Sequence, residues 1–259
     1  MKTINFALQQ HSVRQNFGTD PVETMAAVKA MGYDGMELNH WALPEDPSFY
    51  RSAMERIGLK CFSSMEDWEN LSMDALPRHI ALCKALGANT FVIGSVERSR
   101  LKTDPAYPAQ VIAKMNEMYT LFRAQDLRIG YHSHDIDSQR INGTAFYEMV
   151  MDQTPADFQM IIDTGNTQAG GDDPLALLKK FPGRTSVFHL KGFNSETRYR
   201  TPIWESSLNW EVLLTQALDH CGTETVVIEF DNCGEHDPME YAEASLRWLK
   251  SLLRNMGRI

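Results

Sequence analysis

The chain has 259 residues, 43% hydrophobic and 23% charged, which is typical of a globular protein with a sizeable core. Its formal net charge of -9 gives an acidic surface that repels phosphate backbones and anionic lipids, so we expect neither nucleic acid nor a membrane as partner. Four cysteines without CxxC spacing predict reduced thiols rather than a disulfide scaffold. The opening residues 1–5 lack a signal-peptide pattern, and no apolar run reaches the ~20 residues of a membrane span. We therefore expect a cytoplasmic protein.

Short runs of β-forming residues alternate with longer helical patterns along the whole chain. Proline or an N-cap residue opens several of the helical patterns, and glycine closes several of them. The expected strands are 4–9, 35–38, 60–63, 90–93, 127–132, 158–163, 186–191 and 225–229. The expected helices are 21–31, 47–57, 73–86, 108–125, 143–152, 174–181, 209–220 and 238–255.

Eight alternating strand–helix units predict a parallel sheet. Because no further domain is left over, they favour a closed (β/α)8 TIM barrel in one domain, 1–259, over an open doubly wound sheet. No GxGxxG or GxxxxGK[ST] motif follows a strand, so dinucleotide-binding and P-loop folds lack their main support. The longest irregular segment, 193–207, follows the seventh strand and is expected to lie over the mouth of the barrel as a lid or substrate loop.

Polar side chains end the last four expected strands at matching depth. Catalytic residues of α/β barrels lie at these carboxyl ends, because the loops that follow the strands build the site there. A histidine or acid at one strand end is more often structural than a ligand, but four on adjoining strands would be buried ionisable groups without partners, and a metal would pair them. Mixed nitrogen and oxygen donors suit Mn, Zn, Co or Fe better than Ca. The group comprises His132 or His134, Asp163, His189 and Glu229.

Several segments in this order resemble those of one enzyme superfamily. They are ALQQHSVR (7–14), GYDGMEL (32–38), GYHSHD (130–135), DTGNTQAGGDDP (163–174), GRTSVFHLKGF (183–193) and VVIEFD (226–231). Together they resemble the xylose isomerase-like TIM-barrel superfamily, and within it the sugar phosphate isomerase/epimerase members. The resemblance covers nearly the whole chain and does not specify a substrate.

The resemblance implies one divalent metal, with Mn, Zn, Co, Fe and Mg all compatible, held by residues of strands five to eight. Carried over by position, the ligands are His132, Asp163, His189 and Glu229. Many members have glutamate where this chain has His132, so the second carboxylate of their active site is missing here. His134 faces the same way and is the alternative ligand or a substrate contact.

The resemblance also suggests substrate-binding residues around the metal. Asn166 stands where several epimerases have a substrate-binding histidine, and Lys191 stands where related members carry lysine, so that it could hold a hydroxyl, stabilise an oxyanion or form a plain salt bridge. The other candidate substrate-binding residues are Gln9 and Glu37 at the ends of the first two strands, His134, and Arg198 in the loop after strand seven. Trp41, Trp68 and Phe193 could form an apolar wall.

By resemblance, the chain is expected to be a sugar or keto-sugar isomerase or epimerase. Such enzymes remove a proton next to a carbonyl while the metal stabilises the enediolate. Glu229 is the candidate acid/base, and His134, Lys191 or Glu37 would supply the second group. A lyase that dehydrates a keto-sugar or cleaves a glycoside stays open, whereas an endonuclease IV-type DNA repair enzyme and a non-enzymatic barrel are ranked lower. Because barrels of this kind are often dimers or tetramers, the resemblance also allows a homo-oligomer.

Overall fold

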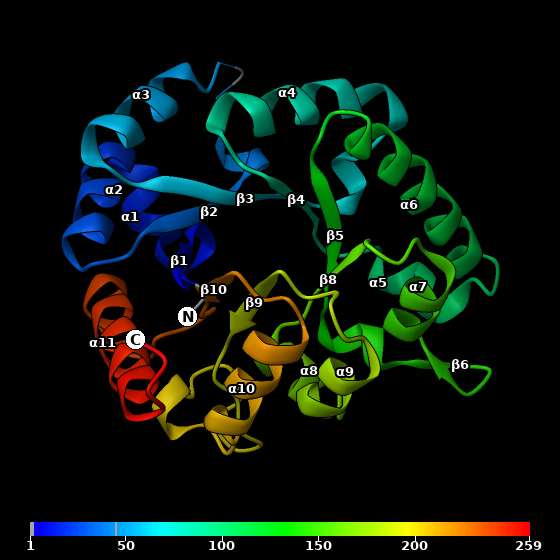
Figure 1. Ribbon diagram of the computed structural model, residues 1–259. Coiled ribbons are helices and arrows are strands. Elements are labelled where there is room, and N and C mark those ends of the chain that lie inside the picture. Colours follow the sequence, from blue (N-terminus) through cyan, green and yellow to red (C-terminus); the bar gives the residue numbers. More distant parts are fainter. Residues whose placement is uncertain (1–2, 45) are drawn as a thin grey trace.

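The computed structural model describes residues 3–44 and 46–259, so Met1 and Lys2 of the amino-terminal segment considered above lie outside the described residues. Eight parallel strands form one sheet in the order β8-β5-β4-β3-β2-β1-β10-β9. In Figure 1 these strands occupy the centre and the helices surround them. The strands are β1 (Asn5–Gln9), β2 (Gly35–Asn39), β3 (Lys60–Glu66), β4 (Thr90–Ile93), β5 (Arg128–His132), β8 (Gln159–Ile161), β9 (Val187–Leu190) and β10 (Thr225–Ile228).

The two edge strands, β8 and β9, close this sheet into a barrel. The backbone bonds at their junction include Met160 N to Arg184 O at 2.7 Å and His189 N to Ile162 O at 3.0 Å. Asp163 and His189 also form a parallel bridge. The predicted (β/α)8 barrel is therefore confirmed, and its junction lies beside two of the predicted metal ligands.

A helix follows every strand of the barrel, as the sequence predicts. Three short helices, α1, α5 and α8, and several 3-10 turns were not predicted from the sequence. Each of these short helices precedes one of the expected helices. The helices are α1 (Arg14–Thr19), α2 (Pro21–Ala30), α3 (Ser48–Ile57), α4 (Leu76–Leu86), α5 (Arg98–Thr103), α6 (Tyr107–Arg123), α7 (Phe146–Gln153), α8 (Thr164–Ala169), α9 (Pro174–Lys180), α10 (Trp210–His220) and α11 (Pro238–Asn255).

The prediction of a helix from residue 143 is wrong at its start. A hairpin of β6 (Arg140–Ile141) and β7 (Thr144–Ala145) precedes α7. Asn142 and Gly143 form its turn with φ of 52° and 89°, and this Asn-Gly pair is the one that favours a two-residue hairpin. The local turn chemistry therefore overrides the helical pattern, and α7 begins only at Phe146.

The N-caps explain why several helices begin where the sequence indicates. The Asp20 carboxylate accepts a hydrogen bond from the Glu23 amide at 2.9 Å, and Pro21 follows as the first helical residue. Asp237 caps α11 in the same way. A carboxylate at this place satisfies amides that have no partner within the helix.

Two apolar layers make up the core. A small inner cluster fills the barrel, and a large cluster packs the outer faces of the strands against the helices. The inner cluster consists of Ala7, Met65, Val92, Ile161, Val187 and Val227, with Phe62 against it. These side chains lie beneath the polar groups of the carboxyl-terminal mouth.

The four cysteines carry free thiols, as predicted. The segment 193–207 is irregular apart from a bridge between Asn194 and Arg198 and a 3-10 turn at Ile203–Glu205. No helix among the described residues combines the length and apolar character needed to span a membrane.

Candidate metal centre and active site

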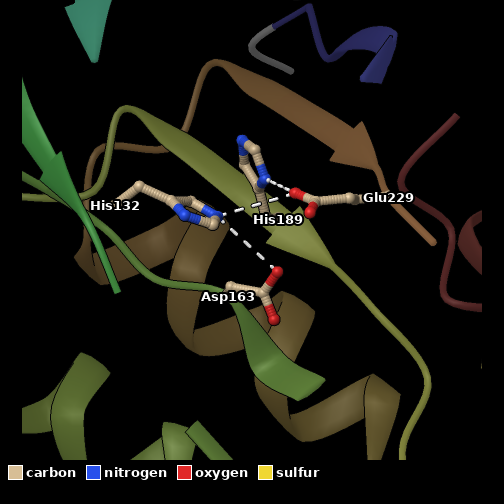
Figure 2. Close-up of side chains that lie close together, drawn as sticks. All are labelled: His132, Asp163, His189 and Glu229. Carbon is tan, nitrogen blue, oxygen red and sulfur yellow. Dashed lines mark hydrogen bonds and ion pairs between the residues drawn. The ribbon is translucent and has the colours of Figure 1, made fainter. Parts of the chain in front are cut away.

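Four buried side chains converge at the mouth of the barrel, each from a neighbouring strand. His132 ends β5, Asp163 follows β8, His189 belongs to β9, and Glu229 follows β10. One potential ligand atom from each lies within 4.8 Å of all the others. Figure 2 shows the four side chains pointing toward one another. The structure thus brings together the four residues that the sequence nominates as metal ligands, and it selects His132 rather than His134 for this group.

The polar atoms of this quartet are poorly satisfied by the protein alone. His132 Nε2 lies 3.6 Å from both Asp163 Oδ2 and Glu229 Oε2, too far for hydrogen bonds. Both nitrogens of His132, and Asp163 Oδ2, are buried and make no hydrogen bond with any described residue. Each such atom costs about 1–3 kcal/mol, and a metal ion in the quartet would satisfy His132 Nε2 and Asp163 Oδ2, the two that face it. Two imidazoles and two carboxylates suit zinc and the other divalent ions named above.

Local hydrogen bonds orient Asp163 so that its Oδ2 makes no hydrogen bond within the described part of the chain and faces the quartet. Its Oδ1 accepts from the Asn166 amide at 2.7 Å and caps α8. Its backbone amide donates to Ser133 Oγ at 3.0 Å. Oδ2 is therefore left pointing at the other three side chains, as Figure 2 shows.

His189 lies between two carboxylates. Its Nδ1 is 2.6 Å from Glu229 Oε2, and its Nε2 is 3.2 Å from Glu37 Oε1, off the line of a good hydrogen bond. Burial lowers the pKa of His189, but the two carboxylates outweigh it and raise the pKa to about 10. Burial likewise opposes ionisation of Glu37, yet the His189 ring and the Ser63 hydroxyl hold the pKa of Glu37 below its ordinary value. Glu37 thus lies behind His189, at the place where ligating histidines commonly have a supporting carboxylate.

Lys191 bridges the quartet and the open cavity. Its Nζ lies 2.7 Å from Glu229 Oε1, 3.3 Å from Asp163 Oδ2 and 3.1 Å from Asp231 Oδ1. Burial disfavours the ammonium form, but the three carboxylates outweigh it and raise the pKa of Lys191 well above its ordinary value. Lys191 is therefore a buried cation at neutral pH.

A cavity of about 400 Å³ opens above the quartet. Six of the residues predicted for the site line it, whereas Glu37, Asp163 and His189 lie beneath. Arg198 is not among its lining residues, since its guanidinium lies over the Phe193 ring at 5.4 Å. The predicted residues that line the cavity are Gln9, His132, His134, Asn166, Lys191 and Glu229.

The aromatic residues suggested as an apolar wall divide between the cavity and other surroundings. Trp41 lines the cavity and is half exposed. Trp68 instead carries the Lys114 ammonium over its ring at 4.3 Å, and Phe193 is buried. Tyr199 of the loop after β9 does line the cavity, so this loop reaches the mouth as predicted.

Several other residues that line the cavity were not predicted from the sequence. Asp231 stands two residues after Glu229, and alternation along an extended chain places both on one side. His11 follows β1 in the same manner. Arg98 and Asp135 form an ion pair at the rim, which no local pattern signals because the two residues are 37 positions apart. These residues are His11, Asn39, Met65, Asp67, Arg98, Asp135, Tyr199 and Asp231.

The sequence model of the xylose isomerase-like TIM barrel family matches residues 25–252. The chain belongs to this family. The strand order and the ring of helices described above are those of a TIM barrel.

One group of curated relatives is similar to this chain in sequence. Inosose dehydratase 2 of Bacillus cereus is 26% identical over 184 residues, which cover 64% of this chain and 61% of that protein. The match therefore spans about three fifths of the relative's length.

Two solved structures share the fold. A sugar phosphate isomerase/epimerase from Parabacteroides distasonis has a TM-score of 0.80 at 17% identity, over 97% of this chain and 94% of that one. The IOLI protein, solved with a zinc atom bound, has a TM-score of 0.74 at 12% identity, over 97% of this chain and 98% of that one. At these identities the likeness shows the fold alone.

Proposed function

We propose that this member of the xylose isomerase-like TIM barrel family is a metal-dependent dehydratase of an uncharged keto-polyol. One observation carries the choice: the quartet has His132 where the resemblance leads us to expect a glutamate paired with Glu229, and the available acid/base groups instead form an adjacent pair, Lys191 and Asp231. One base and one acid are what an elimination needs. The similarity to inosose dehydratases supports the same class.

The unsatisfied atoms of the quartet support metal binding. His132, Asp163, His189 and Glu229 would hold the ion. Such an ion supplies a Lewis acid that stabilises negative charge on a substrate oxygen. Glu229 is then a ligand rather than the base, since its Oε2 faces the histidines and its Oε1 accepts from Lys191.

The charge of the cavity favours a neutral substrate. Four of its lining residues are carboxylates and two are cations, and both cations are paired with carboxylates: Arg98 with Asp135, and Lys191 with three acids. Asp163 and Glu37 add negative charge beneath the cavity, so the site would stay negatively charged even with a divalent ion bound. A phosphorylated sugar, a sugar acid or a DNA phosphodiester would be repelled. The lining carboxylates are Asp67, Asp135, Glu229 and Asp231.

In the proposed reaction Asp231 is the base and Lys191 the acid. Asp231 Oδ1 is held by the Lys191 ammonium, and the side chain is partly exposed to the cavity. The carboxylate takes the proton from the carbon beside the carbonyl, and the electron pair left there forms a double bond as the hydroxyl on the next carbon departs. Lys191 gives that hydroxyl a proton, so that water leaves. The proton on Asp231 then passes to the Lys191 amine across their 3.1 Å contact, which restores both groups.

Neutral polar groups would orient the hydroxyls of the substrate. Burial lowers the pKa of His134 to about 3, so its ring is neutral. Its Nδ1 lies 3.2 Å from the His132 carbonyl oxygen and donates to it, which leaves Nε2 as an acceptor. Gln9, Asn39 and Asn166 line the same cavity. Such groups read hydroxyls without adding charge.

An isomerase or epimerase is the second candidate. Because Asp231 and Lys191 both line the cavity, a proton taken by Asp231 could return to a carbon of the same substrate instead of being followed by loss of water. This alternative shares the first step and differs only in the fate of the hydroxyl.

The test is to incubate the zinc-loaded chain with an inosose in D2O and to follow mass and absorbance. A dehydratase yields a product lighter by one water with the absorbance of an unsaturated ketone. Deuterium uptake without loss of water would instead identify an isomerase. If neither loss of water nor deuterium uptake is seen with the inosose or with other keto-sugars, both candidate functions are refuted. Asp231→Asn should abolish turnover and exchange, whereas Asp219→Asn, which alters an exposed carboxylate at the far end of α10, should not.

A further inference from the structure

A second cluster of metal-binding side chains lies outside the barrel, between its strands and α4. His40, Glu66 and His79 are all buried, and one ligand atom from each lies within 4.8 Å of the others. His40 follows β2 in the 3-10 turn His40–Ala42, Glu66 ends β3, and His79 belongs to α4. Three elements from the stretch 40–86 of the chain therefore meet at this cluster.

Strand alternation separates this cluster from the active-site cavity. Met65 lines the cavity, so its neighbours Ser64 and Glu66 face the opposite side of β3. Ser64 Oγ indeed lies 3.2 Å from Cys83 Sγ of α4. His40 is likewise turned outward, and its ring packs on Phe91 with centroids 5.5 Å apart.

The two imidazoles face each other through the same ring atom. His40 Nδ1 and His79 Nδ1 are 2.9 Å apart, and the ring planes are within 6° of parallel. His79 Nε2 faces the Asn70 carbonyl at 3.4 Å. A carbonyl only accepts, so this contact assigns the His79 proton to Nε2 and leaves a lone pair on its Nδ1. His40 Nδ1 must then carry the proton that the two rings share, and His40 Nε2 faces Cys83 Sγ at 4.0 Å.

Shifting one proton within one ring converts this pair into two metal ligands. If the His40 proton moves from Nδ1 to Nε2, both Nδ1 atoms carry lone pairs, and these atoms lie 2.9 Å apart. Each Nε2–H then has an acceptor, Asn70 O for His79 and Cys83 Sγ for His40. Ligating histidines typically hold their second N–H in this way. The 2.9 Å separation is a few tenths of an ångström below the ~3.3 Å edge of a tetrahedron with Zn–N bonds of about 2.0–2.1 Å.

Glu66 adds a carboxylate oxygen. Its Oε1 accepts from the Asp67 amide at 2.9 Å and from Asn70 Nδ2 at 3.0 Å. Among the described residues no hydrogen bond to Oε2 is made. The side chain is therefore fixed through one oxygen and free to bind through the other.

We propose that His40, Glu66 and His79 form a second metal site, which takes zinc. Two neutral imidazoles and one carboxylate are a common zinc donor set, and water would complete the tetrahedron. The ion would tie the 3-10 turn after β2 to β3 and α4. It lies behind Asn39 and Trp41, which line the cavity, so it would fix the wall of the active site rather than take part in the reaction.

The test is the zinc stoichiometry of the full chain after removal of metals, measured by equilibrium dialysis with elemental analysis. We expect two zinc ions per chain in the wild type. His79→Phe and Glu66→Gln should each lose one, and His220→Ala, at an exposed histidine at the end of α10, should lose none. When cobalt replaces zinc, the visible absorption of the bound ions should be weaker in His79→Phe and Glu66→Gln than in the wild type.

Variants of the barrel mouth separate this inference from the proposed function. Asp163→Asn should lose the other equivalent while the His79-dependent one remains. One equivalent that disappears in Asp163→Asn, or two that persist in both Glu66→Gln and His79→Phe, would overturn the second site. If the wild type binds one zinc ion per chain and only His79→Phe and Glu66→Gln lose it, the second site is upheld and the metal centre of the proposed enzyme is refuted. If His79→Phe fails to fold, Glu66→Gln decides.

Discussion

Glu37→Gln removes a charge from behind His189, a proposed metal ligand, without changing the shape of the side chain. Glu37 Oε1 lies 3.2 Å from His189 Nε2, and Oε2 accepts from Ser63 Oγ at 2.6 Å. Glutamine can keep one of these contacts, but it cannot hold the His189 ring by ionic attraction. The ring then becomes a poorer donor through Nδ1, the atom that faces the quartet.

The expected loss follows from the role of such supporting groups. Removing the outer partner of a ligating histidine lowers metal affinity by about 10- to 100-fold, or about 1.4 to 2.7 kcal/mol. The value should lie in the upper part of this range, since Glu37 and His189 are both fully buried and little water can replace the lost carboxylate.

Zinc affinity would be measured by competition with a chromophoric chelator at fixed pH. Ser63→Ala is the matched control, because it removes a hydrogen bond to the same carboxylate but keeps the charge. Ser63→Ala should lower the zinc affinity less than Glu37→Gln does. Equal losses in the two variants, or an unchanged affinity in Glu37→Gln, would refute the role assigned to Glu37.

Three further changes test other parts of the structure. Lys191→Met should lower turnover by about 10²- to 10⁴-fold through loss of the acid, with the melting temperature measured to exclude unfolding; near-normal turnover would contradict its role. Burial raises the pKa of Asp137 from 3.8 to about 7, so the folded chain keeps a proton that the unfolded chain has lost, and stability should fall as pH rises from about 4 to about 7. Asp137→Asn should remove up to about 4 kcal/mol of that fall in urea titrations, and an unchanged slope would contradict it. Gly192→Ala would place a Cβ 2.0 Å from Thr201 O and should destabilise by about 1–3 kcal/mol, whereas Gly18→Ala, with nothing within 4 Å, should not.

The sequence was sufficient for the fold because each signal was local and repeated. Eight alternations of strand and helix require only periodicity and turn residues, and Asp20, Gly58 and Gly87 mark helix ends in the structure as in the pattern. The hairpin at Asn142 and Gly143 was missed because a helical pattern follows it immediately.

The candidate site was likewise predictable only where local patterns indicate it. The strand-end rule found the quartet, since the carboxyl ends of parallel strands meet at one mouth. Whether His132 or His134 joined it depended on the path of the chain after β5, which no pattern specifies. The Arg98–Asp135 pair and the supporting role of Glu37 arise from packing between distant segments. The metal identity, the cytoplasmic location and a homo-oligomer remain predictions.

The closure of the barrel between β8 and β9 has a dynamic consequence. Asp163 and His189 lie on opposite sides of that junction and are joined by a backbone bridge. An ion bound to both residues would cross-link the two strands at the place where the barrel closes. Amide hydrogens of β8 and β9 should therefore exchange with solvent more slowly when zinc is bound. Removal of zinc by a chelator should speed exchange in these two strands more than in β2 and β3 on the opposite side of the barrel.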